Sequence, residues 1–228
     1  QEMYELGLRY MKRGYYVKAL EQFNRVRNYH RDDPVSVLAE LAVSDIYFKR
    51  GDYEQARLAY EDFARLHPRH RSMDYVTWRI GQCHYKQAPK VAGRDQTRTQ
   101  RAVNVWTGFE SRFPDSKHVH DVQRLLVRSR NRLAIKELYI GAYYKRRDQW
   151  VATQHRAETA LRLHTEMLPA AHPTRRRSAA YLEGSGALTL LTEPSGAQIE
   201  LMRFMPHHRR LVPQHVQHLG PSPLRAVE

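Results

Sequence analysis

Two stretches of this sequence share one pattern of small and aromatic residues. Gly14–Phe23 reads GYYVKALEQF, and Gly51–Tyr60 reads GDYEQARLAY, thirty-seven residues later. Each begins with a glycine that can end a helix in the left-handed conformation and continues with apolar residues at helical spacing. A proline follows each unit, at Pro34 and at Pro68. The sequence therefore predicts repeated helical hairpins, because self-similarity at a period of this length is typical of solenoid proteins.

The positions expected at helix crossings carry small residues. Gly7 precedes the first copy, and Ala19 and Ala56 occupy matching places in the two copies. A larger side chain at such a place would hold the helix backbones apart. We therefore expect these three residues to be buried between paired helices.

Two further copies are less regular. The third runs from Tyr75 to Tyr85, is interrupted by an insertion near residues 87–100, and resumes from Ala102. The fourth is read from Leu138 to Leu161, and its first helix should be unusually long, because Gly141 is the only Gly or Pro between residues 116 and 145. The predicted fold is mainly α, a tetratricopeptide-type solenoid of helical hairpins over residues 1–164.

The length and composition are those of a stably folded protein. The sequence has 228 residues, of which 41% are hydrophobic and 27% are charged, and no apolar run is long enough to span a bilayer. The one cysteine, Cys83, excludes an internal disulfide framework and cysteine-based zinc fingers. The first ten residues lack the apolar core of a secretory signal, so a signal is either absent or already removed.

The net charge is strongly positive. Lys and Arg number 38 against 24 Asp and Glu, which gives +14. Such an excess permits a polyanionic partner, but here the positive residues are spaced along the expected helices and mixed with acids. We therefore expect no nucleic-acid partner. A basic repeat module that binds RNA, acidic lipid or another protein partner in a different assembly is kept as the alternative function.

Motifs for catalysis or for metal binding are absent from the sequence. No Gly-x4-Gly-Lys phosphate loop and no Gly-x-Ser-x-Gly nucleophile motif is present. None of the close histidine pairs has the spacing of a helical zinc site; these pairs are His118 and His120, His207 and His208, and His215 and His218. We therefore expect a protein that is not an enzyme and that has no catalytic residue, metal or cofactor.

Several segments in order resemble the BamD family, also called ComL. They are Ala19–Val26, Leu66–His70, Gly93–Gln96, Arg112–Ser116, Arg130–Ala134 and Trp150–Ala152. The resemblance covers about residues 3–164. It implies a scaffold of the outer-membrane β-barrel assembly (BAM) machinery, at the periplasmic face of the outer membrane. The lipid anchor of the family lies outside this sequence.

The resemblance also implies partners. They are BamA, which is the barrel-forming subunit, the other BAM subunits and unfolded precursors of outer-membrane proteins. In the family, the fourth repeat docks the fifth POTRA domain of BamA partly through arginine. The matching residues here are Arg156 and Arg147, with Tyr144 beside them. An alternative for Arg156 is a contact within its own helix to an acid one turn away.

Other residues are candidates for contact with an extended polypeptide. Aromatic side chains can present both a flat apolar body and a hydroxyl group to such a ligand. The candidates for the groove of the N-terminal repeats are Tyr4, Tyr10, Tyr47 and Tyr85. The candidates in the inserted loop are Arg94, Asp95 and Gln96.

The sequence changes character after residue 164. Residues 165–186 are expected to form a linker. Ala187–Thr192 and Ala197–Leu201 are expected to be strands that pair as a β-hairpin across a turn at residues 193–196. Glu193–Ala197, followed by Leu219–Leu224, resembles part of a PEGA domain. Residues 187–228 are therefore expected to form a small, partial β segment.

Overall fold

The computed structural model describes residues 2–29, 33–166, 188–190, 198–207, 210–221 and 224–227. The described chain contains helices α1 to α9, followed by strands β1 to β4. It divides into two compact units. The first consists of Gln1–Lys90 and Arg94–Ser129, and the second of Val91–Gly93 and Arg130–Glu228.

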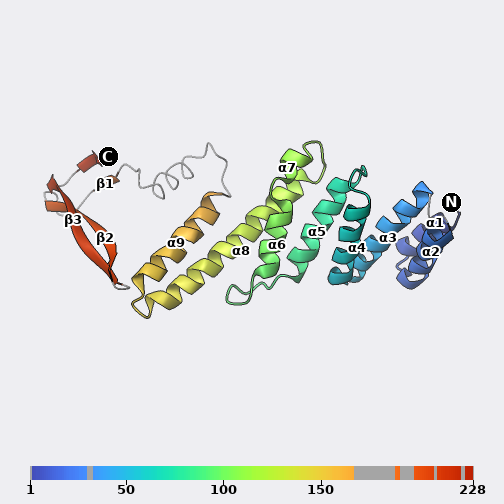
Figure 1. Cartoon of the computed structure of the whole chain (residues 1–228), viewed down its shortest axis with the longest axis horizontal. Helices are drawn as coiled ribbons and strands as arrows, with labels where there is room; N and C mark the ends of the chain where they lie inside the picture. The colour runs from blue at the N-terminus through green and yellow to red at the C-terminus, as the bar shows by residue number, and fades with distance from the viewer. Residues whose placement is uncertain are drawn as a thin grey trace. The chain divides into compact units, whose positions relative to one another are not determined.

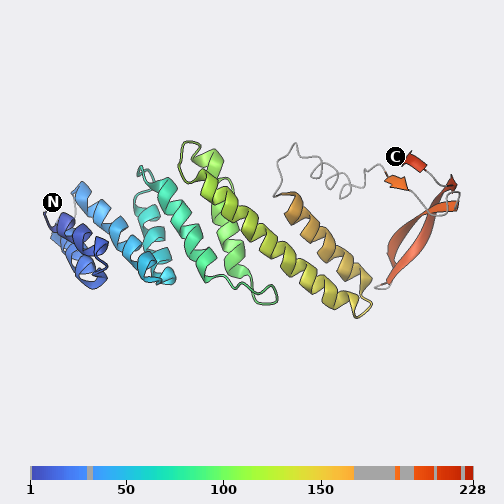
Figure 2. The same ribbon diagram turned by 180° about the vertical axis from the view of Figure 1, so that it is seen from behind.

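Three helical hairpins build most of the first unit (Figure 1). They are α1 (Glu2–Lys12) with α2 (Tyr16–Tyr29), α3 (Pro34–Arg50) with α4 (Tyr53–Leu66), and α5 (Met73–Gln87) with α6 (Thr97–Trp106). The short α7 (Phe109–Arg112) follows, and α8 (Val119–Lys145) begins in this unit. Contacts between α2 and α3 and between α4 and α5 join consecutive hairpins, so α1 to α6 lie in chain order, also when seen from behind (Figure 2). The predicted solenoid of helical hairpins is confirmed.

Glycine makes the turn inside each of the first two hairpins, as predicted. Gly14 has φ +78° and Gly51 has φ +85°, both in the left-handed region that other residues avoid. The N–H of Gly51 donates to the carbonyl of Phe48 at 3.1 Å, and the N–H of Asp52 donates to that of Tyr47 at 3.0 Å. These bonds satisfy carbonyl groups that the end of α3 would otherwise leave without a partner.

The small residues lie where helices approach closely. Ala19 and Ala56 have no exposed surface, and Gly7 is buried. A Cβ atom on Gly7 would lie 2.7 Å from Cε1 of Phe23. The approach is closer still in the third hairpin, where a Cβ on Gly81 would lie 2.1 Å from Nε1 of Trp106. The prediction for Gly7, Ala19 and Ala56 is therefore confirmed.

The core of the first unit consists of three apolar clusters along the stack of hairpins. Phe23 and Ile46 belong to the first cluster, Tyr60 and Phe63 to the second, and Trp106, Phe109 and Val122 to the third. Cys83 lies in the second cluster with no exposed surface, and burial raises the pKa of its thiol to about 12. This arrangement is typical of repeat proteins, in which each repeat packs mainly on its neighbours.

The predicted long helix is also confirmed. Helix α8 has 27 residues, and its C-terminal half belongs to the second unit together with α9 (Trp150–Thr165). The turn between the two helices contains no glycine. Asp148 adopts φ +55° there, a conformation that Asp tolerates better than most residues. The N–H of Gln149 donates to the carbonyl of Tyr144 at 3.1 Å and closes the turn.

The strands do not pair as predicted. The described strands are β1 (Leu188–Leu190), β2 (Gln198–His207), β3 (Arg210–Pro221) and β4 (Leu224–Val227). Strand β1 pairs antiparallel with β4, and β2 pairs antiparallel with β3, so a hairpin of the first two strands is wrong. The reason is length. Strand β2 has ten residues and is followed, after two residues, by the twelve-residue β3, whereas β1 has three residues and offers few ladder bonds.

Two predictions about the C-terminal region remain predictions. The expected linker at residues 165–186 lies outside the described residues except for Thr165 and Glu166. The resemblance to a PEGA domain is not tested by the backbone pairing.

Candidate partner-binding surfaces

Three aromatic rings surround the guanidinium group of Arg79 on α5. Its Cζ atom lies 4.4 Å from the ring centroid of Phe48, 5.0 Å from that of Tyr75 and 4.6 Å from that of Trp78. Nε of Arg79 donates to the Tyr75 hydroxyl at 2.9 Å, and Nη1 donates to Oε1 of Gln82 at 2.9 Å. Phe48, Tyr75, Trp78 and Arg79, here called the Arg79 cluster, are all partly exposed.

Asp45 of α3 links the Arg79 cluster to the second apolar cluster. Its Oδ1 accepts hydrogen bonds from the hydroxyl of Tyr60 and, at 2.7 Å, from the hydroxyl of Tyr75. Burial, reinforced by the charge of Asp45, raises the pKa of Tyr75 to about 12 and also raises the pKa of Tyr60. Both hydroxyls therefore stay protonated and donate to the carboxylate, which fixes α3, α4 and α5 against one another.

His118 extends the aromatic surface to the residue just before α8. Its ring is stacked on Trp78, with centroids 4.1 Å apart and planes 12° apart. The ring is buried, and burial lowers the pKa of His118, so the imidazole is neutral at pH 7. The Ser116 hydroxyl accepts from the N–H of His118 at 3.2 Å and donates to Asp74 at 2.7 Å. The rings of Phe48, Tyr75, Trp78 and His118 thus come from α3, from α5 and from the segment before α8.

Tyr47 is the one predicted groove tyrosine that lines a described pocket. The pocket has a volume of about 420 Å³ and is lined by α2, α3 and α4. Ion pairs lie along it, between Arg27 and Glu40 at 3.7 Å and between Arg65 and Asp62 at 2.8 Å. Its walls therefore carry charges of both signs.

The other three predicted groove tyrosines lie on two hairpins, Tyr4 and Tyr10 on α1 and Tyr85 on α5. Tyr4 packs on Phe23, with ring centroids 5.5 Å apart, and burial raises its pKa. Tyr10 lies beside Tyr15 at 6.4 Å. Tyr85 packs on Trp106 at 6.1 Å. These tyrosines border apolar clusters one and three, and the structure does not bring all four candidates together on one surface.

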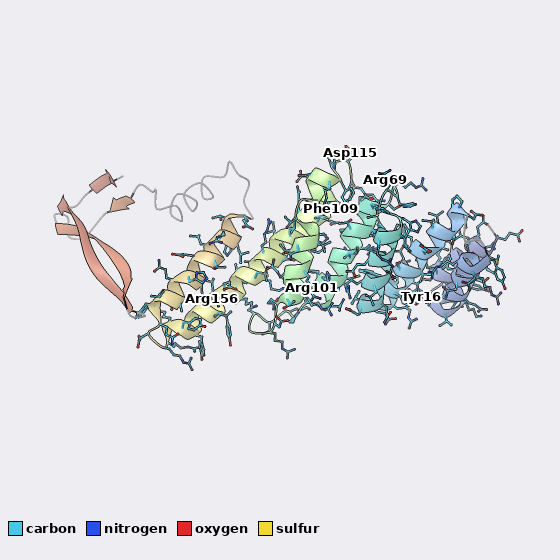
Figure 3. The ribbon with its side chains drawn as sticks, viewed as in Figure 1. Tyr16, Arg69, Arg101, Phe109, Asp115 and Arg156 are labelled. Atoms are coloured by element: carbon cyan, nitrogen blue, oxygen red, sulfur yellow. The ribbon has the colours of Figure 1, made fainter. Side chains whose placement is uncertain are left out.

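A second pocket lies at the start of α3 and the end of α4. It has a volume of about 380 Å³ and includes Pro34, Leu66, His67 and Arg69 in its lining. Figure 3 labels Arg69, which lies in the loop between α4 and α5. Nε2 of His67 is 2.9 Å from Oε2 of Glu40, so this histidine already has a partner within the hairpin.

The three candidates of the inserted loop have different surroundings. Gln96 is 1% exposed; its Nε2 donates to the carbonyl of Pro89 at 3.2 Å, and its Oε1 accepts from the Thr99 hydroxyl at 2.6 Å. Asp95 accepts from the backbone N–H of Thr97 at 3.2 Å, at the first turn of α6. Arg94 is exposed. Gln96 therefore holds the loop from inside, while Arg94 and Asp95 face solvent.

Arg156 projects from α9 and pairs with α8 (Figure 3). Its Nη1 donates to Oε2 of Glu137 at 2.8 Å, and the two side chains are 34% and 15% exposed. The hydrogen bond to Glu137 raises the pKa of Arg156, and Tyr144 adds to the effect. The partner of Arg156 is thus on the neighbouring helix, so the alternative of an acid within its own helix is wrong. The i to i+4 rule considers only one helix, whereas this pair joins two.

Arg147 lies over an exposed aromatic ring. Its Cζ is 3.7 Å from the ring centroid of Tyr143, which is 45% exposed. The Tyr144 ring meets that of Tyr143 edge-on, with centroids 5.6 Å apart. Of the residues predicted from the resemblance, Arg147, Arg156 and Tyr144 therefore all lie on the α8–α9 hairpin.

Sequence reasoning missed several residues of these surfaces. Phe48, Tyr75, Trp78 and Arg79 were not singled out as a cluster. Neither Asp45, which accepts from Tyr75, nor Glu137, which pairs with Arg156, was recognised as a partner. One signal was available on α5, where Tyr75, Trp78 and Arg79 are spaced three and four residues apart and share a helix face.

Within the described residues, no group of three or more His, Cys, Asp or Glu side chains is arranged to hold a metal ion. The described helices also include none that has the length and apolar character of a membrane span.

Comparison with known proteins gives a family match and several relatives. Residues 1–183 match a family model described as YfiO, outer membrane lipoprotein. The outer membrane protein assembly factor BamD of Vibrio cholerae serotype O1 is 25% identical over 166 residues, which cover 69% of this chain and 69% of that protein. BamD of Neisseria meningitidis serogroup A is 28% identical over 129 residues, covering 53% and 48%. BamD of Xylella fastidiosa strain 9a5c is 23% identical over 175 residues, covering 73% and 60%.

The chain spans between about half and about two thirds of the length of these relatives. Among solved structures, a complex of the TPR2AB domain of yeast Sti1 is similar with a TM-score of 0.44 and 13% identity, over 80% of this chain and 70% of that one. A tetratricopeptide repeat protein from Parabacteroides merdae is similar with a TM-score of 0.41 and 14% identity, over 80% and 58%.

Proposed function

The chain belongs to the YfiO family of outer membrane lipoproteins, whose model matches residues 1–183, and on this premise we propose that it is a non-enzymatic scaffold in outer membrane protein assembly. Its relatives carry the name outer membrane protein assembly factor BamD. We place it at the periplasmic face of the outer membrane. Its partners are BamA, other BAM subunits and unfolded outer-membrane protein precursors.

The Arg79 cluster is the observation that carries the proposal for precursor binding. Tyr, Trp and Arg are the residue types that dominate binding energy in protein interfaces. Here they are partly exposed and fixed in place by Asp45 and His118, so little side-chain freedom is lost when a ligand binds. An extended polypeptide with alternating aromatic residues would pack its rings on Phe48 and Trp78.

The guanidinium of Arg79 has a polar role in this site. The surrounding rings hold it by cation–π contacts, and Tyr75 and Gln82 orient it. Its planar group can then donate hydrogen bonds to backbone carbonyls or to a carboxylate of the bound segment. The site thus offers both apolar rings and hydrogen-bond donors, which match the side chains and the backbone carbonyls of an extended polypeptide.

Peptide binding by the isolated chain tests this role. The probe is a fluorescent peptide with the sequence of one membrane strand of an outer-membrane β-barrel, and a scrambled peptide is the specificity control. We expect Arg79→Gln to weaken binding about tenfold. Arg101→Gln, on the exposed surface of α6 (Figure 3), removes the same charge and should leave affinity unchanged. Equal binding by the wild-type and Arg79→Gln chains, both folded by circular dichroism, contradicts the proposal.

The α8–α9 hairpin is proposed to dock BamA, through the region that contains Arg147, Arg156 and Tyr144. A pull-down with the POTRA domains of BamA tests this. Arg156→Glu should abolish capture while the helical circular dichroism signal is retained.

Polyanion binding is the second candidate, and the net charge of +14 favours it. The two functions differ in their response to salt. Affinity for RNA or for anionic lipid falls steeply and linearly with the logarithm of salt concentration. Binding of an apolar peptide to the Arg79 cluster should change little, because its attraction depends mainly on buried area.

A further inference from the structure

The turn between α1 and α2 carries apolar side chains that face solvent. Tyr15 is 55% exposed and Val17 is 76% exposed. Tyr16, which lies between them and is labelled in Figure 3, packs on the first apolar cluster. The core of the first unit therefore uses Tyr16 and leaves Tyr15 and Val17 at the surface.

The charges of this turn have one sign. Residues 8–18, here called the basic turn, contain no acid. Their basic residues are all exposed; these are Arg9, Lys12, Arg13 and Lys18. Among the described residues none of these four forms an ion pair, whereas farther along α2 Arg25 pairs with Glu21 at 2.7 Å. The uncompensated positive charge of this hairpin therefore lies at the basic turn, and a complementary surface is anionic.

The aromatic and basic residues of the turn are held beside one another. The N–H of Tyr15 donates to the carbonyl of Tyr10 at 2.9 Å, and the two rings lie 6.4 Å apart. Nζ of Lys18 is 5.8 Å from both ring centroids. These contacts restrict the side chains before any ligand binds, which reduces the entropy lost on binding. Tyrosine next to lysine and arginine is a combination that favours the membrane–water interface, where the rings lie at headgroup level and the cations reach phosphate.

The equivalent turn of the second repeat lacks these apolar residues. Thirty-seven residues after Tyr15 the chain has Asp52, and thirty-seven residues after Val17 it has Glu54. Both turns have the same left-handed glycine, and Asp52 pairs with Arg50 at 3.1 Å. A hairpin of this repeat therefore folds with acids at the two positions, so its fold does not explain why the first turn exposes a tyrosine and a valine.

We propose that the basic turn is a membrane-contact site, at which Tyr15 and Val17 enter the interface of a bilayer and the four bases bind anionic phospholipid headgroups. The turn is open to such a surface, because a Cβ atom on Gly14 would meet no atom within 4 Å. The chain belongs to a family of outer membrane lipoproteins, so a membrane is a surface that such a protein meets. This contact adds to the proposed function, which uses none of these residues, and it depends on one turn and not on the net charge of the chain.

Flotation of the purified 228-residue chain with vesicles tests the basic residues. The probe is a vesicle of equal parts phosphatidylglycerol and phosphatidylethanolamine, and the neutral control is phosphatidylcholine. Lys12→Gln with Arg13→Gln should weaken binding to the anionic vesicles about twentyfold, since each base near an anionic surface contributes about fivefold. Lys49→Gln with Arg50→Gln removes the same charge at the equivalent turn of the second repeat and should have a much smaller effect. Equal losses from the two pairs, or a wild-type chain that does not float, overturn the proposal.

Two further variants test the apolar residues. Tyr15→Ser removes the ring without changing the charge and should weaken vesicle binding about fivefold. Tyr29→Ser removes a 75% exposed ring at the other end of α2 and is the matched control, with no expected effect. Tyr15→Asp with Val17→Glu gives the first turn the residues of the second, so the chain should stay folded by circular dichroism and lose flotation. Retained flotation of either Tyr15 variant overturns the role of the apolar residues.

Two other occupants of the basic turn would also overturn the proposal. One is RNA, detected as binding of a single-stranded oligonucleotide that Tyr15→Ser weakens as much as it weakens vesicle binding. The other is a second copy of the chain, which sedimentation would detect as a dimer that Tyr15→Ser dissociates. The expected result in both experiments is no dependence on Tyr15. Peptide binding at the Arg79 cluster should be unchanged in all these variants, so the proposed function is tested separately.

Discussion

The ring of His118 lies flat on the indole of Trp78, with centroids 4.1 Å apart and planes 12° apart. Burial lowers the pKa of His118, and the charges of Lys117 and Arg79 act in the same direction. Asp74 and Asp121 act in the opposite direction and are outweighed. The neutral imidazole is therefore the favoured form of this histidine in the folded protein at pH 7.

Stability should fall in mild acid partly because of His118. In the unfolded chain a histidine takes up its proton at about pH 6.5, whereas folded His118 resists protonation at that pH. The unfolded state then binds more protons, so the free energy of unfolding decreases as pH falls below that value. We expect His118→Gln to reduce this decrease in urea titrations at several pH values. Part of it should remain, because the pKa values of His70 and His84 are also lowered. Identical pH profiles for the two proteins would contradict the assignment.

Gly81→Ala should be strongly destabilising, because the new methyl group would overlap the Trp106 ring at about the 2.1 Å separation found for an added Cβ. A tightly packed core resists such an insertion at a cost of about 1–3 kcal/mol. Trp106→Phe in the same background makes room and should recover part of that loss, which makes the two changes non-additive. Gln100→Ala, on the exposed side of α6, is the control. Additive effects in thermal melts would show that the two residues do not compete for space.

Gly51→Val should destabilise through the backbone alone. No atom lies within 4 Å of a Cβ at this position, so the substitution causes no clash. The left-handed φ of +85° is strained for a β-branched residue, at a cost of about 1–3 kcal/mol. Asn tolerates this region better, so Gly51→Asn should cost less than Gly51→Val. The denaturant midpoints of the two variants check the order, and the reverse order would refute the backbone argument.

Glu54 should contribute stability that depends on pH and salt. It accepts from Arg57 at 2.6 Å and from Arg98 at 2.8 Å, and these bonds, led by that of Arg57, lower its pKa to about 2. A lowered carboxyl pKa means that the contribution is complete above about pH 4.5 and is lost as pH falls toward 2. The side chain is 45% exposed, so solvent screening keeps the contribution below about 1 kcal/mol.

Glu54→Gln checks this expectation. The difference in unfolding free energy from wild type should shrink at high salt and below pH 4.5. Glu21→Gln removes a more exposed carboxylate, paired with Arg25 at 2.7 Å, and is the control. If Glu54→Gln lowers the free energy of unfolding no more than Glu21→Gln does, the ion pairs of Glu54 with Arg57 and Arg98 do not stabilise the fold measurably.

The parts of the fold that could be predicted from the sequence depend on the conformational preferences of single residues and short segments. Gly14 and Gly51 mark their turns because the left-handed conformation is needed at a single residue, and the length of α8 follows from the lack of helix breakers over residues 116–140. The repeat period then places each hairpin beside the next. Neither inference requires knowledge of distant contacts.

The candidate sites were harder to predict, because they depend on how helices cross. Tyr75 and Asp45 are 30 residues apart and belong to different hairpins, and no spacing rule brings them together. Glu137 and Arg156 are 19 residues apart, beyond the reach of any rule for one helix. The pairing of β1 with β4 is also long-range, from Leu188 to Val227, whereas sequence signals favour neighbouring strands.

Cys83 makes the middle of the first unit accessible to kinetic measurement. Its thiol has no exposed surface and a pKa raised to about 12, so an added thiol reagent finds neither a path to the sulfur nor a reactive thiolate while the second apolar cluster stays closed. Alkylation then requires transient opening of the surrounding helices, and its rate reports how often they separate. Because Cys83 is the one cysteine of these 228 residues, alkylation of this chain reports opening at one defined place.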